Sequence, residues 1–279
     1  GFKSVYAYSD RPEIHSGDDH FAIESFVWPE AIAAIETEHS QTVLNLPSKP
    51  DVSSAVSEIA LGLRRLGPRT LLFLREIEEI TWSDPEGQLG TYIRTKPETV
   101  SKHGRKVVIM GENNSIEGVT ETEETWLVFS RKVSTSDGVD IGHTEIAFRL
   151  ESQDGDNEFS AAPVFDSPLI VYFPTVVQTN LGFLVQGPYR TTPNRESVPE
   201  NDEWNKHLVS ETAMLLVDAL HELCDLGFLT VDTLRSLPLV GNRFTERTMV
   251  APFFTTVQEA LRTQPLLPDF RGGYVAAQN

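Results

Sequence analysis

Apolar and polar residues alternate with a period of two through the middle of the chain, and apolar residues recur every three to four positions in a later segment. Strand-like runs occupy residues 91–94, 106–110, 124–133, 144–150 and 168–173, with polar, turn-rich loops at 111–118 and 134–140. Short strands at this spacing predict a largely antiparallel sheet. The period-3.6 pattern over residues 203–226, with Asn201 or Asp202 as the N-cap, predicts a long helix that covers the sheet. This part of the chain therefore has the pattern of an α+β domain.

The flanking segments have patterns of their own. Before the sheet, we expect strands at residues 21–28 and 41–46, a helix over 52–66 with Val56, Ile59, Leu63 and Leu66 on its buried face, and two strand-like pieces within 69–82. A turn-rich break at 82–88 separates these elements from the sheet. After the long helix, short helices at 231–237 and 257–263 precede a hairpin-type Gly272-Gly273 turn. We therefore expect domains at 1–82 and 83–229 and a tail at 230–279.

Composition narrows the class of protein. The 279 residues suffice for about two domains, and a hydrophobic content of 39% is too high for a disordered chain. A formal charge of −18 argues against a nucleic acid or an anionic membrane surface as a partner. The single cysteine, Cys224, excludes an internal disulfide and is interpreted as a small buried hydrophobe. The absence of a disulfide framework suits a reducing compartment, and there is no apolar run near the ~20 residues of a membrane span and no visible signal peptide, so a cytoplasmic protein is expected.

Two familiar kinds of site are poorly supported. His15, His20 and His39 beside Asp18 and Asp19 lack the i, i+4 spacing of helical zinc motifs, so no metal site is predicted. A Ser-His-Asp set composed of Ser210, His207 and Asp218 has no G-x-S-x-G elbow around its serine. An ATP-independent hydrolase is therefore the weakest interpretation.

The loop between an apolar run at residues 181–185 and the long helix holds the strongest candidate. Gly187, Pro188 and Pro193 prevent regular structure there, while core elements at both ends hold the loop, so that Arg195 can be aimed. A guanidinium matches phosphate oxygens well. The alternative is a local ion pair with one of the neighbouring acids, Glu196, Glu200 or Glu211.

The order of apolar strand, Pro- and Thr-containing loop, Asn194-Arg195-Glu196 and long helix resembles the middle domain of the ninety-kilodalton heat-shock chaperones. It is closer still to their sacsin-like relatives in the histidine-kinase-like (GHKL) ATPase superfamily. The resemblance implies that Arg195 contacts the γ-phosphate of ATP. It also implies a fold in which the C-terminal part of a Bergerat-type α/β sandwich precedes a middle domain with a mixed or antiparallel sheet.

The N-terminal residues GFKSVY are similar to the end of the glycine-rich lid of that superfamily. The resemblance makes Gly1, Phe2, Lys3 and Ser4 nucleotide-binding residues and puts Thr42 near the adenine pocket. A surface strand threonine is the alternative for Thr42. The helix that holds magnesium and the segment that reads adenine would then lie in an upstream partner segment, so the cofactor of the parent protein is expected to be ATP with Mg²⁺, and this chain alone is expected to bind ATP poorly.

Two departures from the family pattern leave a second hypothesis open. Pro199 stands where the chaperones have an assisting glutamine, and Gln41 stands where the family has glycine. The chain is thus expected to be either part of a chaperone-like ATPase with protein clients or partner domains, or an interaction scaffold that keeps the architecture without ATP turnover. The residues do not fix the oligomeric state, for which a dimer is one alternative.

Overall fold

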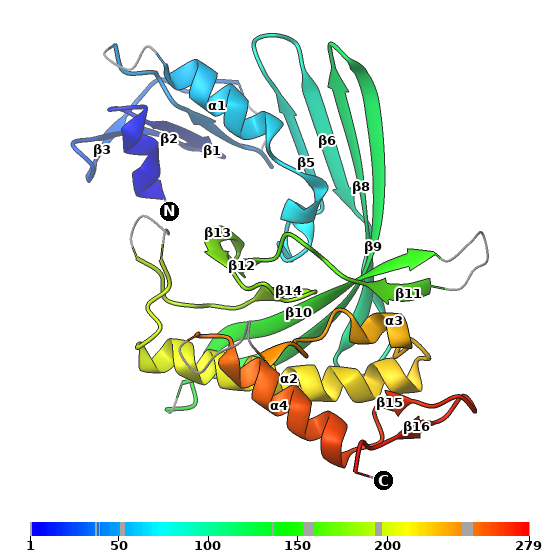
Figure 1. Cartoon of the computed structure of the whole chain (residues 1–279). Helices are drawn as coiled ribbons and strands as arrows, with labels where there is room; N and C mark the ends of the chain where they lie inside the picture. Colours follow the sequence, from blue (N-terminus) through cyan, green and yellow to red (C-terminus); the bar gives the residue numbers. More distant parts are fainter. Residues whose placement is uncertain are drawn as a thin grey trace. The chain divides into compact units, whose positions relative to one another are not determined.

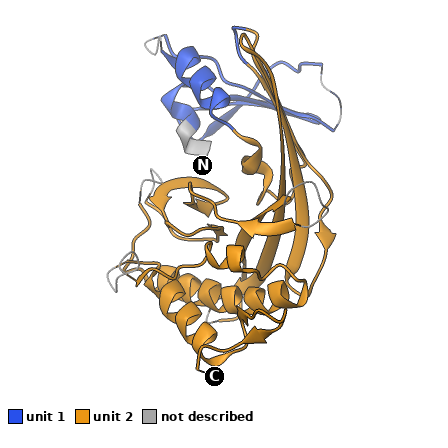
Figure 2. Cartoon of the chain, turned by 45° about the vertical axis from the view of Figure 1, so that its right-hand side comes forward, with its two compact units in different colours: residues 1–66, 84–86 blue, residues 67–83, 87–279 orange. Residues whose placement is uncertain are grey.

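The computed structural model describes residues 2–36, 38, 40–50, 54–135, 137–152, 159–192, 197–241 and 248–278, with the side chains of residues 2–4 left out. These residues form two compact units, shown in Figure 2: residues 1–66 with 84–86, and residues 67–83 with 87–279. Both units contain helices and a β-sheet, so the predicted α+β class is confirmed. No helix in the described part of the chain is long and apolar enough to cross a membrane.

The first unit is built on a four-stranded antiparallel sheet in the order β3-β2-β1-β4. Its elements are η1 (Phe2–Ala7), β1 (Glu13–Ser16), β2 (Asp19–Glu24), β3 (Trp28–Ala31), β4 (Thr42–Asn45) and α1 (Ala55–Arg64). The single strand predicted at 21–28 is a hairpin, because Ser25 and Phe26 adopt left-handed conformations with φ of 50° and 71°.

The helix α1 is rotated relative to the expectation. Its buried residues are Ala55 and Ala60, whereas Val56 and Ile59 of the predicted buried face are 52% and 44% exposed. Leu63 of α1 and Leu66 just beyond it, the other two residues of the predicted face, are half-buried, so the expected face is correct only toward the end of the helix.

The second unit contains a mixed ten-stranded sheet whose main order is β13-β12-β14-β10-β9-β8-β6-β5. All its pairs are antiparallel except the parallel pair of β12 and β14. The strands are β5 (Glu79–Ser83), β6 (Leu89–Arg94), β7 (Glu98–Thr99), β8 (Gly104–Ser115), β9 (Gly118–Ser134), β10 (Asp140–Ser152), β11 (Phe159–Ala162), β12 (Pro168–Val171), β13 (Phe173–Gln178) and β14 (Leu184–Gln186).

Two predictions within this sheet are wrong. The loop expected at 111–118 is mostly strand, since Glu112 pairs with Glu121 and the ladder continues to Ser115 opposite Gly118. Of the two strand-like pieces expected within 69–82, only the second is a strand, β5, because residues 69–78 form the 3₁₀ turn η2 (Pro68–Leu71) and an irregular segment. Arg94 donates to the carbonyls of residues 75 and 77 in that segment, which satisfies polar groups that a neighbouring strand would otherwise bind.

The long helix α2 (Glu203–Asp225) matches the predicted helix within one residue. Asp202 is its N-cap and accepts hydrogen bonds from the amides of Trp204 and Asn205. The later elements are α3 (Val231–Leu234), α4 (Ala251–Thr263) and a ribbon of β15 (Leu267–Pro268) with β16 (Tyr274–Val275). The helix α2 packs against β9 and β10 of the sheet, and α4 packs against α2 (Figure 1).

The sheet of the second unit is covered on both faces. On the helix side, the core includes Phe129, Phe148, Phe183 and Leu216 with Phe253 of α4, so residues 251–263 share a core with the preceding domain. Cys224 packs against this core as a half-buried side chain, and burial raises the pKa of its thiol. The opposite face carries a second cluster that includes Leu72, Phe73, Val107, Trp126 and Ile170.

Candidate functional site

The loop between β14 and α2 is anchored to the core by two aromatic residues. Tyr189 is buried, and burial raises the pKa of its phenol to about 12, while its hydroxyl lies 3.4 Å from Thr212 Oγ1 of α2. Trp204 Nε1 donates to the carbonyl of Pro188 over 2.9 Å. The start of the loop is thus joined to α2 at two points, one in the first turn of the helix and one further along it.

Asn205 connects both ends of the loop to α2. Its side chain is fully buried, and its Oδ1 accepts a hydrogen bond from the amide of Arg190 over 2.8 Å. Its Nδ2 donates to the carbonyls of Arg190 and Pro199, each over 3.0 Å. One amide side chain therefore uses its acceptor and both of its donors to hold the ends of the loop together.

A second set of bonds closes the loop nearer its tip. The amide of Thr192 donates to the carbonyl of Ser197 over 2.9 Å, and the amide of Ser197 donates to Thr192 Oγ1 over 3.1 Å. Val198, the next residue, is buried. Residues 193–196 connect these two anchors, and Arg195 with its neighbours Asn194 and Glu196 lies outside the described residues.

The other arginine of the loop is tied locally. Arg190 Nη1 lies 3.3 Å from Asp202 Oδ2, and the amide of Asn205 together with Arg190 lowers the pKa of that carboxyl. Glu211, one of the three acids considered as a partner for Arg195, lies 3.4 Å from Arg131 of β9. Arg190 is thus paired with Asp202, and Glu211 is paired with Arg131.

The remaining predicted nucleotide residues belong to the first unit. Gly1 lies outside the described residues, and Phe2, Lys3 and Ser4 lie in the 3₁₀ helix η1. Thr42 is the exposed first residue of β4, and its Oγ1 lies 2.7 Å from Ser16 Oγ. That contact also suits the alternative of a surface strand threonine.

The other candidate sites do not assemble. His15 and His20 face each other across β1 and β2 with their Nδ1 atoms 2.9 Å apart, and no group of three His, Cys, Asp or Glu suited to a metal occurs among the described residues. His207 stacks near Trp204, and Asp218 pairs with Arg131, so the Ser210, His207 and Asp218 set has no catalytic geometry.

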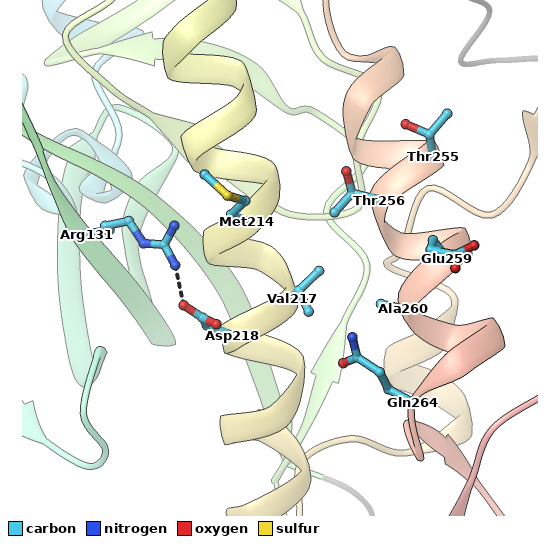
Figure 3. Close-up of a pocket in the computed structure, with 9 residues that line it drawn as sticks. All are labelled: Arg131, Met214, Val217, Asp218, Thr255, Thr256, Glu259, Ala260 and Gln264. Carbon is cyan, nitrogen blue, oxygen red and sulfur yellow. Dashed lines mark hydrogen bonds and ion pairs between the residues drawn. The ribbon is translucent and has the colours of Figure 1, made fainter. Parts of the chain in front are cut away.

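A groove lies between α2 and α4. Figure 3 shows its lining: Met214, Val217 and Asp218 from α2, Thr255, Thr256, Glu259 and Ala260 from α4, Gln264 at the end of α4, and Arg131 of β9 beside Asp218. Its volume is about 570 Å³. Arg131 pairs with both Asp218 and Glu211, and Glu259 pairs with Arg262. Among the described lining residues, the one cation is thus already paired with carboxylates, which does not suit a phosphate site.

Sequence reasoning found the loop but missed the residues that hold it. Asn205 is one polar residue within an amphipathic helix, and nothing in its spacing indicates that it is buried. The Asp202 N-cap was the available signal, because it fixes the first turn of α2 and so places Asn205 under the loop.

The chain has sequence similarity to part of a longer plant protein. The chain is similar to Protein NO VEIN of Arabidopsis thaliana, with 28% identity over 275 residues, covering 86% of this chain and 10% of that protein. The chain thus spans about a tenth of the length of this curated relative. No protein-family model and no solved structure matches the chain.

Proposed function

We propose that this chain is part of a chaperone-like ATPase of the histidine-kinase-like superfamily, in which Arg195 contacts the γ-phosphate of ATP. The observation that carries the proposal is the anchoring of the loop by Asn205 and by the pair Thr192 and Ser197. A loop whose only purpose is connection does not need a buried amide with three hydrogen bonds. A loop that presents a charged group to a ligand does, because catalytic positioning requires a rigid support.

The role of Arg195 in this proposal is electrostatic. Its guanidinium stabilises negative charge that develops on the oxygens of the transferring phosphoryl group, and it remains protonated throughout. A carboxylate of the upstream segment orients the attacking water. The energy of this contact is realised mainly in the transition state, so its loss lowers kcat more than it weakens ATP binding.

The nucleotide site in this proposal is divided between segments. The first unit, as the C-terminal part of a Bergerat-type sandwich, contributes backbone from Gly1, Phe2, Lys3 and Ser4 and the hydroxyl of Thr42. In this proposal the magnesium ligands come from the upstream partner segment that the family resemblance implies. Mg²⁺ would there neutralise charge on the β- and γ-phosphates.

A second candidate is an interaction scaffold without ATP turnover. The observation in its favour is Pro199, which takes the place of the assisting glutamine and whose carbonyl is already occupied by Asn205. In this alternative the same anchors preserve a surface for protein partners, and Arg195 has no phosphate to contact.

The experiment that separates them is a steady-state ATPase assay on the parent protein with Arg195→Ala, beside Arg190→Ala as the matched control. Arg190 lies in the same loop but pairs with Asp202, so its loss removes one charge without removing the proposed contact. We expect Arg195→Ala to lower kcat by about 10²-fold or more with little change in KM, and Arg190→Ala to retain most of the rate. Equal rates for both variants and the wild type, or no ATPase activity in the wild type, would favour the scaffold.

A further inference from the structure

A cavity in the second unit combines buried charge with an unsatisfied polar atom. Its volume is about 380 Å³. It lies where the irregular segment after η2 covers β10 and β14, with the β12–β13 turn at one side. The lining residues are Phe73, Leu74, Arg75, Glu76, Ile77, Gly142, His143, Glu145, Tyr172 and Gln186.

Glu145 of β10 is the charged centre of the cavity. Its side chain is 1% exposed, and its Oε1 accepts hydrogen bonds from Arg75 Nη2 over 2.6 Å and from Arg105 Nη2 over 2.8 Å. Both guanidiniums use the same oxygen, so Oε2 accepts no hydrogen bond within the described part of the chain. A buried carboxylate normally satisfies both oxygens, because unmet hydrogen-bonding capacity in the interior is costly.

Gln186 lies next to Glu145 on the same face of the sheet. The two residues are directly paired across β10 and β14, which places their side chains side by side. Gln186 is 4% exposed, and its Oε1 is buried without a hydrogen-bond partner among the described residues. An unsatisfied buried amide oxygen at a cavity wall calls for a donor from something that enters the cavity.

Arg75 supplies the opposite polarity at the same cavity. Its side chain is 41% exposed, and among the described residues it donates only through Nη2, to Glu145. The buried guanidinium of Arg94 binds the carbonyl of Arg75 over 2.8 Å and fixes its backbone. Among the described residues, the lining of the cavity therefore holds two oxygens without a hydrogen bond, one of them buried behind the wall, beside a cation held by a single ion pair.

Two more residues shape the cavity. Burial, reinforced by nearby Arg75, lowers the pKa of His143, which disfavours a further positive charge at the cavity. Tyr172, the residue between β12 and β13, adopts a left-handed conformation with φ of 63°. A non-glycine residue in this region is strained, and such strain is concentrated at ligand-binding positions.

We propose that this cavity binds a small zwitterion of the α-amino acid class. The ammonium group donates to Glu145 Oε2 and Gln186 Oε1, the carboxylate accepts from Arg75, and an apolar side chain contacts Phe73, Leu74 and Ile77. An anion alone leaves Gln186 Oε1 unsatisfied, and a cation alone leaves the donors of Arg75 unused. A ligand with both poles a few ångströms apart satisfies all three groups.

The test is calorimetric titration of the protein with L-leucine, beside leucine methyl ester, which lacks the carboxylate charge, and N-acetyl-leucine, which lacks the ammonium. We expect L-leucine to bind and each blocked form to bind at least tenfold more weakly. The remaining α-amino acids are titrated in the same way to define the preferred side chain. Absence of binding by all of them at millimolar concentration, or equal binding of the blocked forms, overturns the proposal.

Variants locate the site. Gln186→Met keeps the volume and removes the acceptor, and Arg75→Gln removes the cation, so each is expected to weaken binding at least tenfold. Arg149→Gln is the matched control, because Arg149 lies on the same β10 strand in a surface pair with Glu151 at 3.3 Å. Unchanged affinity in both variants, or a crystal grown with L-leucine that holds only a water on Gln186 Oε1, contradicts the proposal. The blocked ligands need no variant, so the test stands even if a substitution prevents folding.

Discussion

Replacing Asn205 by alanine removes the three hydrogen bonds that anchor the loop of Arg195 to α2. The lost contacts are those of Oδ1 with the amide of Arg190 and of Nδ2 with the carbonyls of Arg190 and Pro199. With a net contribution of about 0.5–1.5 kcal/mol each, the expected loss of unfolding free energy is about 2–4 kcal/mol. The side chain is fully buried, so water does not readily replace these partners.

Urea denaturation followed by tryptophan fluorescence measures this loss. With an m-value of about 3 kcal/mol/M, the midpoint is expected to fall by about 1 M. Asn205→Asp separates the contacts, because a carboxylate still accepts from the amide of Arg190 but cannot donate to either carbonyl. Amide exchange at Arg190 should therefore accelerate in Asn205→Ala. Asn205→Asp should also lose stability, because its second carboxylate oxygen would face the carbonyls of Arg190 and Pro199 in a buried site.

Asn201→Ala is the matched control, since Asn201 is exposed and lies just before the same helix. Its unfolding free energy should stay within about 0.5 kcal/mol of the wild type. If Asn205→Ala also stays within that range, or if exchange at Arg190 is unchanged, the loop does not depend on Asn205 and the reasoning fails.

Three further substitutions test other parts of the second unit. Gly182→Ala should cost about 2–4 kcal/mol of stability in thermal unfolding, because a Cβ would lie 2.5 Å from the backbone of Ser236. Gly273→Ala is the control and should be neutral, because its Cβ would come no nearer than 3.6 Å to another residue. Burial opposes ionisation of Glu222, yet hydrogen bonds from residues 101 and 103 lower its pKa below 4.5. The ionised carboxylate therefore stabilises the folded protein above that value, and this stabilisation is lost as pH falls through the folded pKa. Glu222→Gln should accordingly flatten the pH dependence of the urea midpoint in acid. The pKa of His143 is lowered by burial, so the unfolded chain binds the proton more tightly than the folded chain does. The free energy of unfolding should therefore decline as pH falls from 7.5 to 5.5, and His143→Gln should remove that part of the decline. An unchanged pH profile in either variant would contradict the assigned environment.

Local sequence patterns predict the helices and strands that are determined by residues close together in the chain. The helix α2 was predicted from its Asp202 N-cap and its apolar period, and the strand-like runs in the sheet were recognised from alternation. These signals fail where a distant residue decides the outcome. Residues 71–74 are apolar enough for a strand, but they cover a face of the sheet, and the next carbonyls bind Arg94.

Strand lengths were underestimated for a related reason. The ends of β8 and β9 are rich in Glu, Asn and Thr, which single-sequence reasoning assigns to loops. In the structure these residues pair along an antiparallel ribbon in which most of these polar side chains are exposed or half-buried. Pairing satisfies their backbone groups, and polar side chains do not interfere with it.

The cavity at Glu145 lies beyond what local pattern can predict. Gln186 and Glu145 are 41 positions apart and meet only because β14 pairs with β10. Arg75 lies in the irregular segment after η2, which the sequence predicts to be a strand. Each of the three residues looks like an ordinary surface polar residue until the sheet order is known.

The most direct test of the central proposal is calorimetric titration with magnesium-ATP of this chain and, in parallel, of the protein extended by its upstream segment. The divided nucleotide site predicts saturable binding by the extended protein and weak or undetectable binding by this chain alone. If the extended protein binds no ATP, Arg195 has no phosphate to contact, the ATPase proposal is refuted, and the scaffold alternative is favoured.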